Sequence, residues 1–129
     1  QGYSSAASDV YKRQGVTLSE WSDVIPYAKN LQERGAKNVL VSMGGKGAVL
    51  IAENGQIIAG ESSKGVVKNT VGAGDSMVAG FMAGWMQKRD YEHAFRMGLA
   101  SGGASACSEN LATRQEIETE YEKTAVHYL

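Results

Sequence analysis

The sequence predicts one α/β domain, and three observations lead to that prediction. An apolar run without alternation, residues 38–43 (NVLVSM), is typical of a strand that is buried on both faces. Two further apolar runs flank Asn54-Gly55, which is a strong hairpin signal. Apolar residues at helical spacing precede and follow these runs. Because no repeat or interdomain linker interrupts this order of helix, strands and helices, the pattern is that of an α/β fold.

The first helix is expected to begin near Thr17 or Ser19, since either residue is a favourable N-cap, and to end at Gly35. Its apolar positions are spaced by three and four residues: Trp21, Val24, Ile25, Ala28 and Leu31. Pro26 lies inside this pattern, and we expect it to kink the helix or to mark a restart.

Strands are expected where apolar runs meet turn signals. Residues 48–52 (AVLIA) and 56–60 (QIIAG) form the predicted hairpin around Asn54-Gly55. Residues 65–68 are a short strand candidate, and residues 125–129 (AVHYL) are a candidate for a final strand.

Three helices are predicted in the second half of the chain. The first spans about residues 75–88, with its apolar face assigned to Val78, Phe81, Met82 and Trp85 and close backbone approach to Ala79, Gly80, Ala83 and Gly84. The second, residues 91–106, is rich in apolar and small residues and is expected to be largely buried. The third begins at Thr113, because Glu116 three residues later completes a capping box.

Composition excludes several classes of protein. The formal charge is −1, so no overall field favours nucleic acid or an anionic membrane. The apolar runs are far too short to span a bilayer, and we expect a cytoplasmic protein. One cysteine excludes an intrachain disulfide and a Cys-rich metal site, and the two histidines lack partners at metal-ligand spacing, so no metal-ligating residue is assigned.

Residues 1–14 (QGYSSAASDVYKRQ) differ in character from the rest of the chain. They have no apolar periodicity and no turn pattern, and they are rich in Ser and Ala. We expect this segment to be extraneous to the natural protein or disordered. Residues 15–129 therefore contain the candidate functional sites.

The turn Gly72-Ala73-Gly74-Asp75 is the first candidate functional site. Small residues directly before a helix let backbone N–H groups face a ligand, and the free N–H groups of a helix start carry partial positive charge. These features indicate an anion site. The alternative is that Asp75 simply caps the helix and the glycines only make the turn, since Asp is a preferred cap.

Ser42-Met43-Gly44-Gly45-Lys46-Gly47 is the second candidate. It follows the end of a buried strand, where ligands of open α/β sheets collect. The segment is not a Walker A motif, which needs four residues between its first Gly and Gly-Lys. A plain glycine turn between two strands is the alternative.

The string Asn-Thr-Val-Gly-Ala-Gly-Asp-Ser-Met-Val-Ala-Gly-Phe, residues 69–81, closely resembles the second signature of the ribokinase/PfkB family of carbohydrate kinases. The resemblance implies a ribokinase-like (Rossmann-like) three-layer α/β fold, of which residues 15–129 would be the C-terminal, nucleotide-binding part. It implies transfer of the γ-phosphoryl of ATP to a sugar hydroxyl with Mg²⁺. Asp75 matches the catalytic base, the amides of Gly72, Ala73 and Gly74 match the anion hole, and residues 42–47 with Gly74 match the ATP site.

Within the family, the resemblance is to the branch that phosphorylates fructose 1-phosphate to fructose 1,6-bisphosphate, and Asn69 modestly favours this branch. Tagatose 6-phosphate or another sugar is the alternative substrate. A nucleotide-binding module without catalysis is the alternative class, and we expect the chain alone to be inactive. The expected partners are ATP, a sugar phosphate and, for the intact protein, a second copy of itself; nucleic acid and membranes are not expected.

Overall fold

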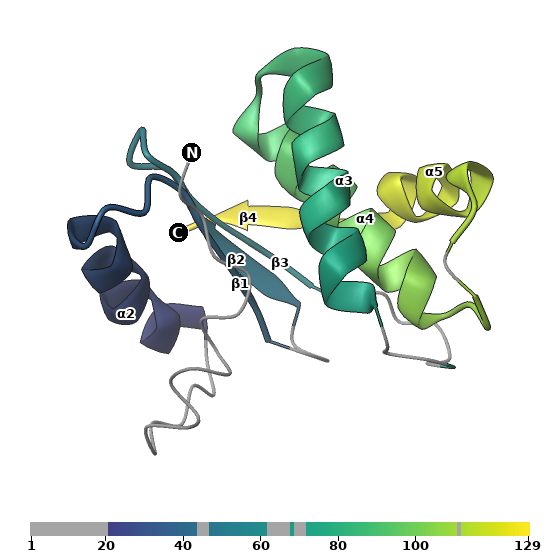
Figure 1. Cartoon of the computed structure of the whole chain (residues 1–129), viewed down its shortest axis with the longest axis horizontal. Helices are drawn as coiled ribbons and strands as arrows, with labels where there is room; N and C mark the ends of the chain where they lie inside the picture. The colour runs from purple at the N-terminus through teal and green to yellow at the C-terminus, as the bar shows by residue number, and fades with distance from the viewer. Residues whose placement is uncertain (1–20, 44–46, 62–67, 69–71, 111) are drawn as a thin grey trace. The chain divides into compact units, whose positions relative to one another are not determined.

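The computed structural model describes residues 21–43, 47–61, 68, 72–110 and 112–129. The chain divides into two compact units (Figure 1). The first comprises residues 1–59 and 127–129, and the second comprises residues 60–126.

The first unit begins, within the described residues, with helix α2, Trp21–Glu33. The helix runs through Pro26 without interruption, so the predicted restart there is wrong. Proline lacks the N–H that would bond four residues back, yet its exposed ring is accommodated on the solvent side. The predicted stop is confirmed, because Gly35 adopts φ +114° and its N–H donates to the Gln32 carbonyl at 3.0 Å.

Four strands form one sheet in the order β1-β2-β3-β4. Strand β1 (Val39–Ser42) pairs antiparallel with β2 (Ala48–Ile51), and β3 (Ile57–Gly60) and β4 (Val126–Tyr128) follow. The register aligns Val39 with Ile51 and Ser42 with Ala48. All three strongly predicted strands and the final one are confirmed. Of the candidate strand at 65–68, only Lys68 lies within the described residues.

The β2–β3 connection is the hairpin that the sequence predicts. Gly55 adopts φ +91°, and the Asn54 side-chain oxygen accepts a hydrogen bond of 2.9 Å from the Gln56 N–H. The Ala52 N–H donates to the Gln56 carbonyl at 2.9 Å, which closes the turn. Asn and Gly therefore act here through the properties that made them a turn signal.

The core of the first unit lies between α2 and one face of the sheet. Val24 and Ala28 of the helix pack against Val39, Val41, Val49, Ile51 and Ala59 of the strands. Burying one such aliphatic side chain stabilises the fold by about 1.5–3 kcal/mol. Leu40 and Leu50, at the alternate positions, are buried as well. Burial on both faces explains why these strands show no apolar alternation in the sequence.

The second unit is built on the helical hairpin of α3 (Ala73–Lys88) and α4 (Tyr91–Ala106), which lie side by side (Figure 1). Glycines set how closely the two helices approach. A methyl group added at Gly80 would lie 2.6 Å from the Met97 carbonyl oxygen, and one at Gly84 would lie 2.8 Å from the Ala94 Cα. The predicted close approach at these two glycines is confirmed.

The outward face of α3 differs from the prediction. Ala79 and Ala83 are exposed rather than packed, and Met82 is 48% exposed, whereas Phe81 is buried. The apolar side of the helix is therefore narrower than its sequence suggests. Gly80 and Gly84 contribute close backbone contacts with α4, next to the side chains of Met77 and Phe81.

Helix α5, Arg114–Lys123, follows α4. The Thr113 hydroxyl accepts a hydrogen bond from the Glu116 N–H, and the Glu116 carboxylate accepts one from the Thr113 N–H, so the predicted capping box is confirmed. The other end of α5 is joined to α4 through Tyr121, whose ring lies under the Arg96 guanidinium at 4.3 Å. No helix of the described residues combines the length and the apolar character needed to cross a membrane.

Candidate functional site at the start of helix α3

The start of α3 has an uncommon construction. Its N-cap is Gly72, with φ 80° and ψ −3°, a left-handed conformation that disfavours any residue with a side chain. The Gly72 carbonyl accepts the first helical hydrogen bond from the Ser76 N–H at 2.9 Å. As at every helix start, the N–H groups of Ala73, Gly74 and Asp75 have no intrahelical partner. The glycine cap supplies no side-chain acceptor for them.

The helix begins at Ala73, two residues earlier than predicted, and this shift decides between two interpretations of Asp75. Asp75 is the third residue of the helix rather than its cap. Its side chain is exposed and has no hydrogen bond or ion pair with the described residues. The alternative in which Asp75 simply caps the helix is therefore wrong, and its carboxylate faces solvent at the positive end of the helix.

Gly74 is not required by the packing of the chain. A methyl group built on Gly74 would meet no atom of the described residues within 4 Å, and the residue is exposed. Its φ also lies outside the left-handed region that favours glycine. A glycine without a steric or conformational reason leaves room at the helix start for the close approach of a ligand.

Helix α4 supports the first turn of α3 through close backbone contacts. A methyl group at Gly102 would lie 3.1 Å from the Ala73 carbonyl oxygen, and one at Gly98 would lie 2.9 Å from the Met77 carbonyl oxygen. The first turn of α3 therefore rests directly on the backbone of α4. Such rigid support is what a preorganised binding site requires.

The second candidate segment connects β1 to β2. Ser42 pairs with Ala48, the Met43 N–H donates to the Gly47 carbonyl at 2.7 Å, and Gly47 adopts φ +91°. The segment thus connects two strands that pair antiparallel. Gly44, Gly45 and Lys46 lie outside the described residues, as does Asn69. Residues 42–47 belong to the first unit, whereas residues 72–75 belong to the second.

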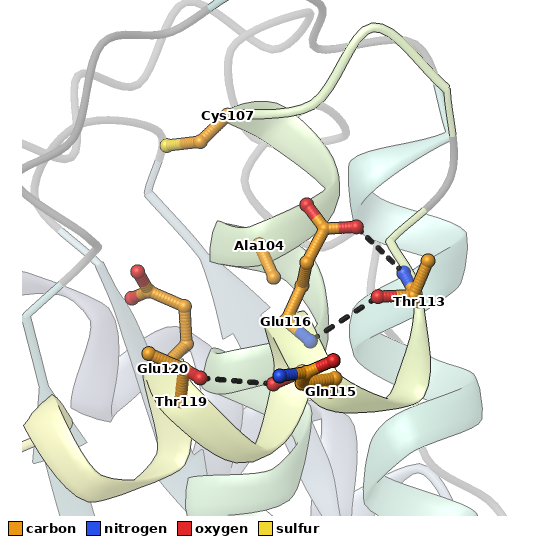
Figure 2. Close-up of a pocket in the computed structure, with 7 residues that line it drawn as sticks. All are labelled: Ala104, Cys107, Thr113, Gln115, Glu116, Thr119 and Glu120. Carbon is orange, nitrogen blue, oxygen red and sulfur yellow. Dashed lines mark hydrogen bonds between the residues drawn. The ribbon is translucent and has the colours of Figure 1, made fainter.

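A pocket of about 290 Å³ lies between the end of α4 and the start of α5 (Figure 2). Five of its seven lining residues have polar side chains; the seven are Ala104, Cys107, Thr113, Gln115, Glu116, Thr119 and Glu120. Figure 2 shows Glu116 and Thr113 bound to each other at its rim, and the Thr119 hydroxyl donating to the Gln115 carbonyl at 3.0 Å. Two carboxylates make this pocket unsuitable for phosphate, in contrast to the start of α3.

Hydrogen bonding holds the pKa of Glu116 below its ordinary value. The Ser108 hydroxyl donates to its carboxylate at 2.6 Å, and the Thr113 N–H donates at 3.0 Å. Both bonds favour the charged form. Glu116 therefore contributes to the capping of α5.

Across the described residues, no group of three or more His, Cys, Asp or Glu side chains could hold a metal ion.

Both ring nitrogens of His93 lie within hydrogen-bond distance of neighbouring side chains. Its Nδ1 lies 2.8 Å from the Tyr121 hydroxyl, and its Nε2 lies 2.9 Å from the Gln87 Oε1. Burial, followed by the nearby positive charge of Lys88, lowers the pKa of His93.

Comparison with known proteins identifies the family of this chain. The model of the pfkB family of carbohydrate kinases matches residues 7–118. The chain belongs to this family. The 1-phosphofructokinase of Bacillus subtilis (strain 168) is 43% identical over 104 residues, which are 81% of this chain and 34% of that protein. The chain thus spans about a third of the length of the curated relatives it matches.

Solved structures agree with the family. A candidate phosphofructokinase from Staphylococcus aureus superposes with a TM-score of 0.87 and 37% identity, over 95% of this chain and 40% of that one. Phosphofructokinase-2 from Escherichia coli, solved in complex with substrates and products, superposes with a TM-score of 0.78 and 25% identity, over 95% and 39%. The predicted ribokinase-like α/β fold is confirmed by these superpositions.

Proposed function

We propose that this chain is the C-terminal, nucleotide-binding part of an ATP-dependent sugar-phosphate kinase whose substrate is fructose 1-phosphate. The observation that carries the proposal is the start of α3, where Gly72 leaves the first amides without a cap and Asp75 presents an unpartnered carboxylate among the described residues. The family match includes this turn, and the identity to a 1-phosphofructokinase supports the choice of sugar.

In the proposed reaction, the sugar hydroxyl oxygen forms a bond to the γ-phosphorus of ATP while the bond to the β,γ-bridging oxygen breaks. The hydroxyl proton passes to Asp75, and ADP leaves. The amides of Gly72, Ala73 and Gly74 stabilise the charge that develops on the γ-phosphoryl oxygens. Residues 42–47, together with Gly74, are proposed to bind the nucleotide.

The position of Asp75 weakens it as a base, because a helix start stabilises the charged carboxylate. This is compatible with the reaction, since phosphoryl transfer passes through a loose transition state and the proton is accepted late. Positioning and charge stabilisation contribute more than base strength. Mg²⁺ would neutralise charge on the phosphates of bound ATP, and none of the described residues of this chain is assigned to hold it.

A steady-state assay of the full-length protein tests the proposal. ATP with fructose 1-phosphate should give the highest kcat/KM, followed by tagatose 6-phosphate, with fructose 6-phosphate as the control substrate. Preference for tagatose 6-phosphate would support a sugar-phosphate kinase but replace fructose 1-phosphate as its substrate. Absence of ATP-dependent phosphorylation of any of the three would contradict the proposal.

The 129-residue chain gives a second, independent comparison. Substrate enclosure and positioning supply much of the rate in such reactions, and we propose that the chain alone binds ATP without transferring phosphate. Isothermal titration with ATP and a turnover assay on the same preparation separate binding from catalysis. Measurable turnover by the isolated chain would contradict this part of the proposal.

For the full-length protein we propose a homodimer, which sedimentation analysis would test.

A further inference from the structure

Ser105 is a buried hydroxyl on α4 that joins two segments distant in sequence. Only 5% of the residue is exposed. Its hydroxyl donates a hydrogen bond of 3.1 Å to the Ser76 Oγ and accepts one of 3.3 Å from the Ala112 N–H. One side chain thus uses both its donor and an acceptor position inside the second unit.

The two hydrogen-bond partners of Ser105 lie at the starts of two helices, α3 and α5. Ser76 directly follows Asp75, and its own N–H makes the first hydrogen bond of α3 to the Gly72 carbonyl. Ala112 directly precedes Thr113, the N-cap of α5 and part of the rim of the pocket in Figure 2. Ser105 therefore connects the candidate anion site to the segment that begins α5.

We propose that Ser105 is a positioning residue that fixes the first turn of α3, and with it Asp75, relative to the segment before α5. The inference rests on the proposed function, because positioning matters only if the α3 turn performs chemistry. Burial excludes bulk water as an easy replacement for the hydroxyl, so its removal leaves the Ala112 N–H and the Ser76 hydroxyl without their partner. The first turn of α3 then loses a lateral constraint while its helical hydrogen bonds remain.

Ser101 provides a matched control on the same helix. It lies one turn before Ser105, is 4% exposed, and packs against Gly80. Its side chain makes no hydrogen bond with the described residues. Replacing either serine by alanine removes one buried oxygen from α4, but only the change at Ser105 breaks the bridge.

The experiment compares Ser105→Ala, Ser105→Thr and Ser101→Ala in the full-length protein. Ser105→Ala should lower kcat about fivefold to tenfold, the loss expected for one hydrogen bond that orients a reacting group, with the KM for ATP changed less than about twofold. Ser105→Thr keeps the hydroxyl and should recover much of kcat. Ser101→Ala should retain kcat within about twofold.

Hydrogen exchange gives a readout that does not depend on activity. Exchange of the peptides containing residues 72–77 and 108–113 should accelerate in Ser105→Ala and remain unchanged in Ser101→Ala. Equal loss of kcat in both alanine variants, or wild-type kcat and exchange in Ser105→Ala, would overturn the inference. If the wild-type protein phosphorylates no sugar phosphate, the proposed function fails, whereas accelerated exchange would still establish the bridge.

Discussion

Helices α3 and α5 begin in opposite ways, although both carry an acidic residue at their third position. At the start of α5, Thr113 caps the helix and Glu116 reaches back to it, while Ser108 binds the same carboxylate. At the start of α3, Gly72 offers no side chain, and Asp75 has no partner among the described residues. The same position serves stability in one helix and remains open in the other.

The comparison indicates that the start of α3 is less stable than a helix start with a side-chain cap. Relative to a Ser, Thr, Asn or Asp cap, a glycine cap costs about a few tenths of a kcal/mol, and α3 also accepts the conformational cost of glycine. Local rules are usually broken at functional sites, where a ligand offsets the loss. A phosphate group bound at the α3 start would satisfy the same amides that a cap would satisfy.

The largest expected effect is on turnover, and it should differ between variants of Asp75 and Glu116. In the full-length protein, Asp75→Asn should lower kcat by about a thousandfold, within the usual range for a positioned base, while ATP still binds. Glu116→Gln should leave kcat within about twofold, because its carboxylate is committed to the cap. Kinetic assays and ATP titrations of both variants check this, and near-wild-type turnover by Asp75→Asn would refute its role.

Next in size is the effect of a side chain at the α3 cap. Gly72→Ala places a β-carbon at φ 80°, which should cost about 1–2 kcal/mol in the free energy of unfolding. Denaturant unfolding measures this cost. Gly74→Ala is the control, since this exposed helical glycine has an ordinary φ and its added methyl meets no atom of the described residues, so the free energy of unfolding should be unchanged or higher. A neutral Gly72→Ala would show that the turn does not need its left-handed residue.

Removing the α5 cap should affect stability alone. Thr113→Ala deletes the hydroxyl that accepts the Glu116 N–H and should cost about 1 kcal/mol. Turnover should remain unchanged, in contrast to Asp75→Asn, because the Ser105 bridge uses the Ala112 N–H and not the Thr113 hydroxyl. Thermal unfolding and a kcat measurement on the same protein test both statements, and a large loss of kcat would mean that the Thr113 hydroxyl itself acts on the α3 start.

The smallest expected effect is a pH dependence specific to α5. The pKa of Glu116 is lowered in the folded state, chiefly by the Ser108 hydroxyl, so its contribution to stability is complete above the pKa of the unfolded chain. It is lost as pH falls through the folded-state pKa. The drop in Tm from pH 7 to pH 3 should therefore be smaller in Glu116→Gln than in Glu118→Gln, and an identical drop would contradict the assignment.

Much of this fold could be predicted because several signals act locally. Thr113 with Glu116 and Asn54 with Gly55 use chemistry that depends on neighbours in sequence, and both were predicted correctly. Continuous apolar runs likewise indicated buried strands, although not that β1 and β2 pair antiparallel.

Other features depend on contacts that no local pattern encodes. The sequence predicts the start of α3 two residues late, because Gly72 and Gly74 favour a turn locally, whereas the contact of the Ala73 carbonyl with Gly102 of α4 has no local sequence signal. Ser105 has no distinguishing mark among the small residues of α4, and its role depends on Ser76 and Ala112 approaching from other segments.

The central claim is that the start of α3 is kept open for a phosphate group, and Gly74→Ala tests it most directly. The added methyl meets no atom of the described residues, so the free energy of unfolding should be unchanged or higher. The same methyl would obstruct a ligand at the helix start, and kcat/KM for ATP should fall at least about tenfold. Stability retained with activity lost is the predicted result; retained stability with wild-type kcat/KM would contradict the account.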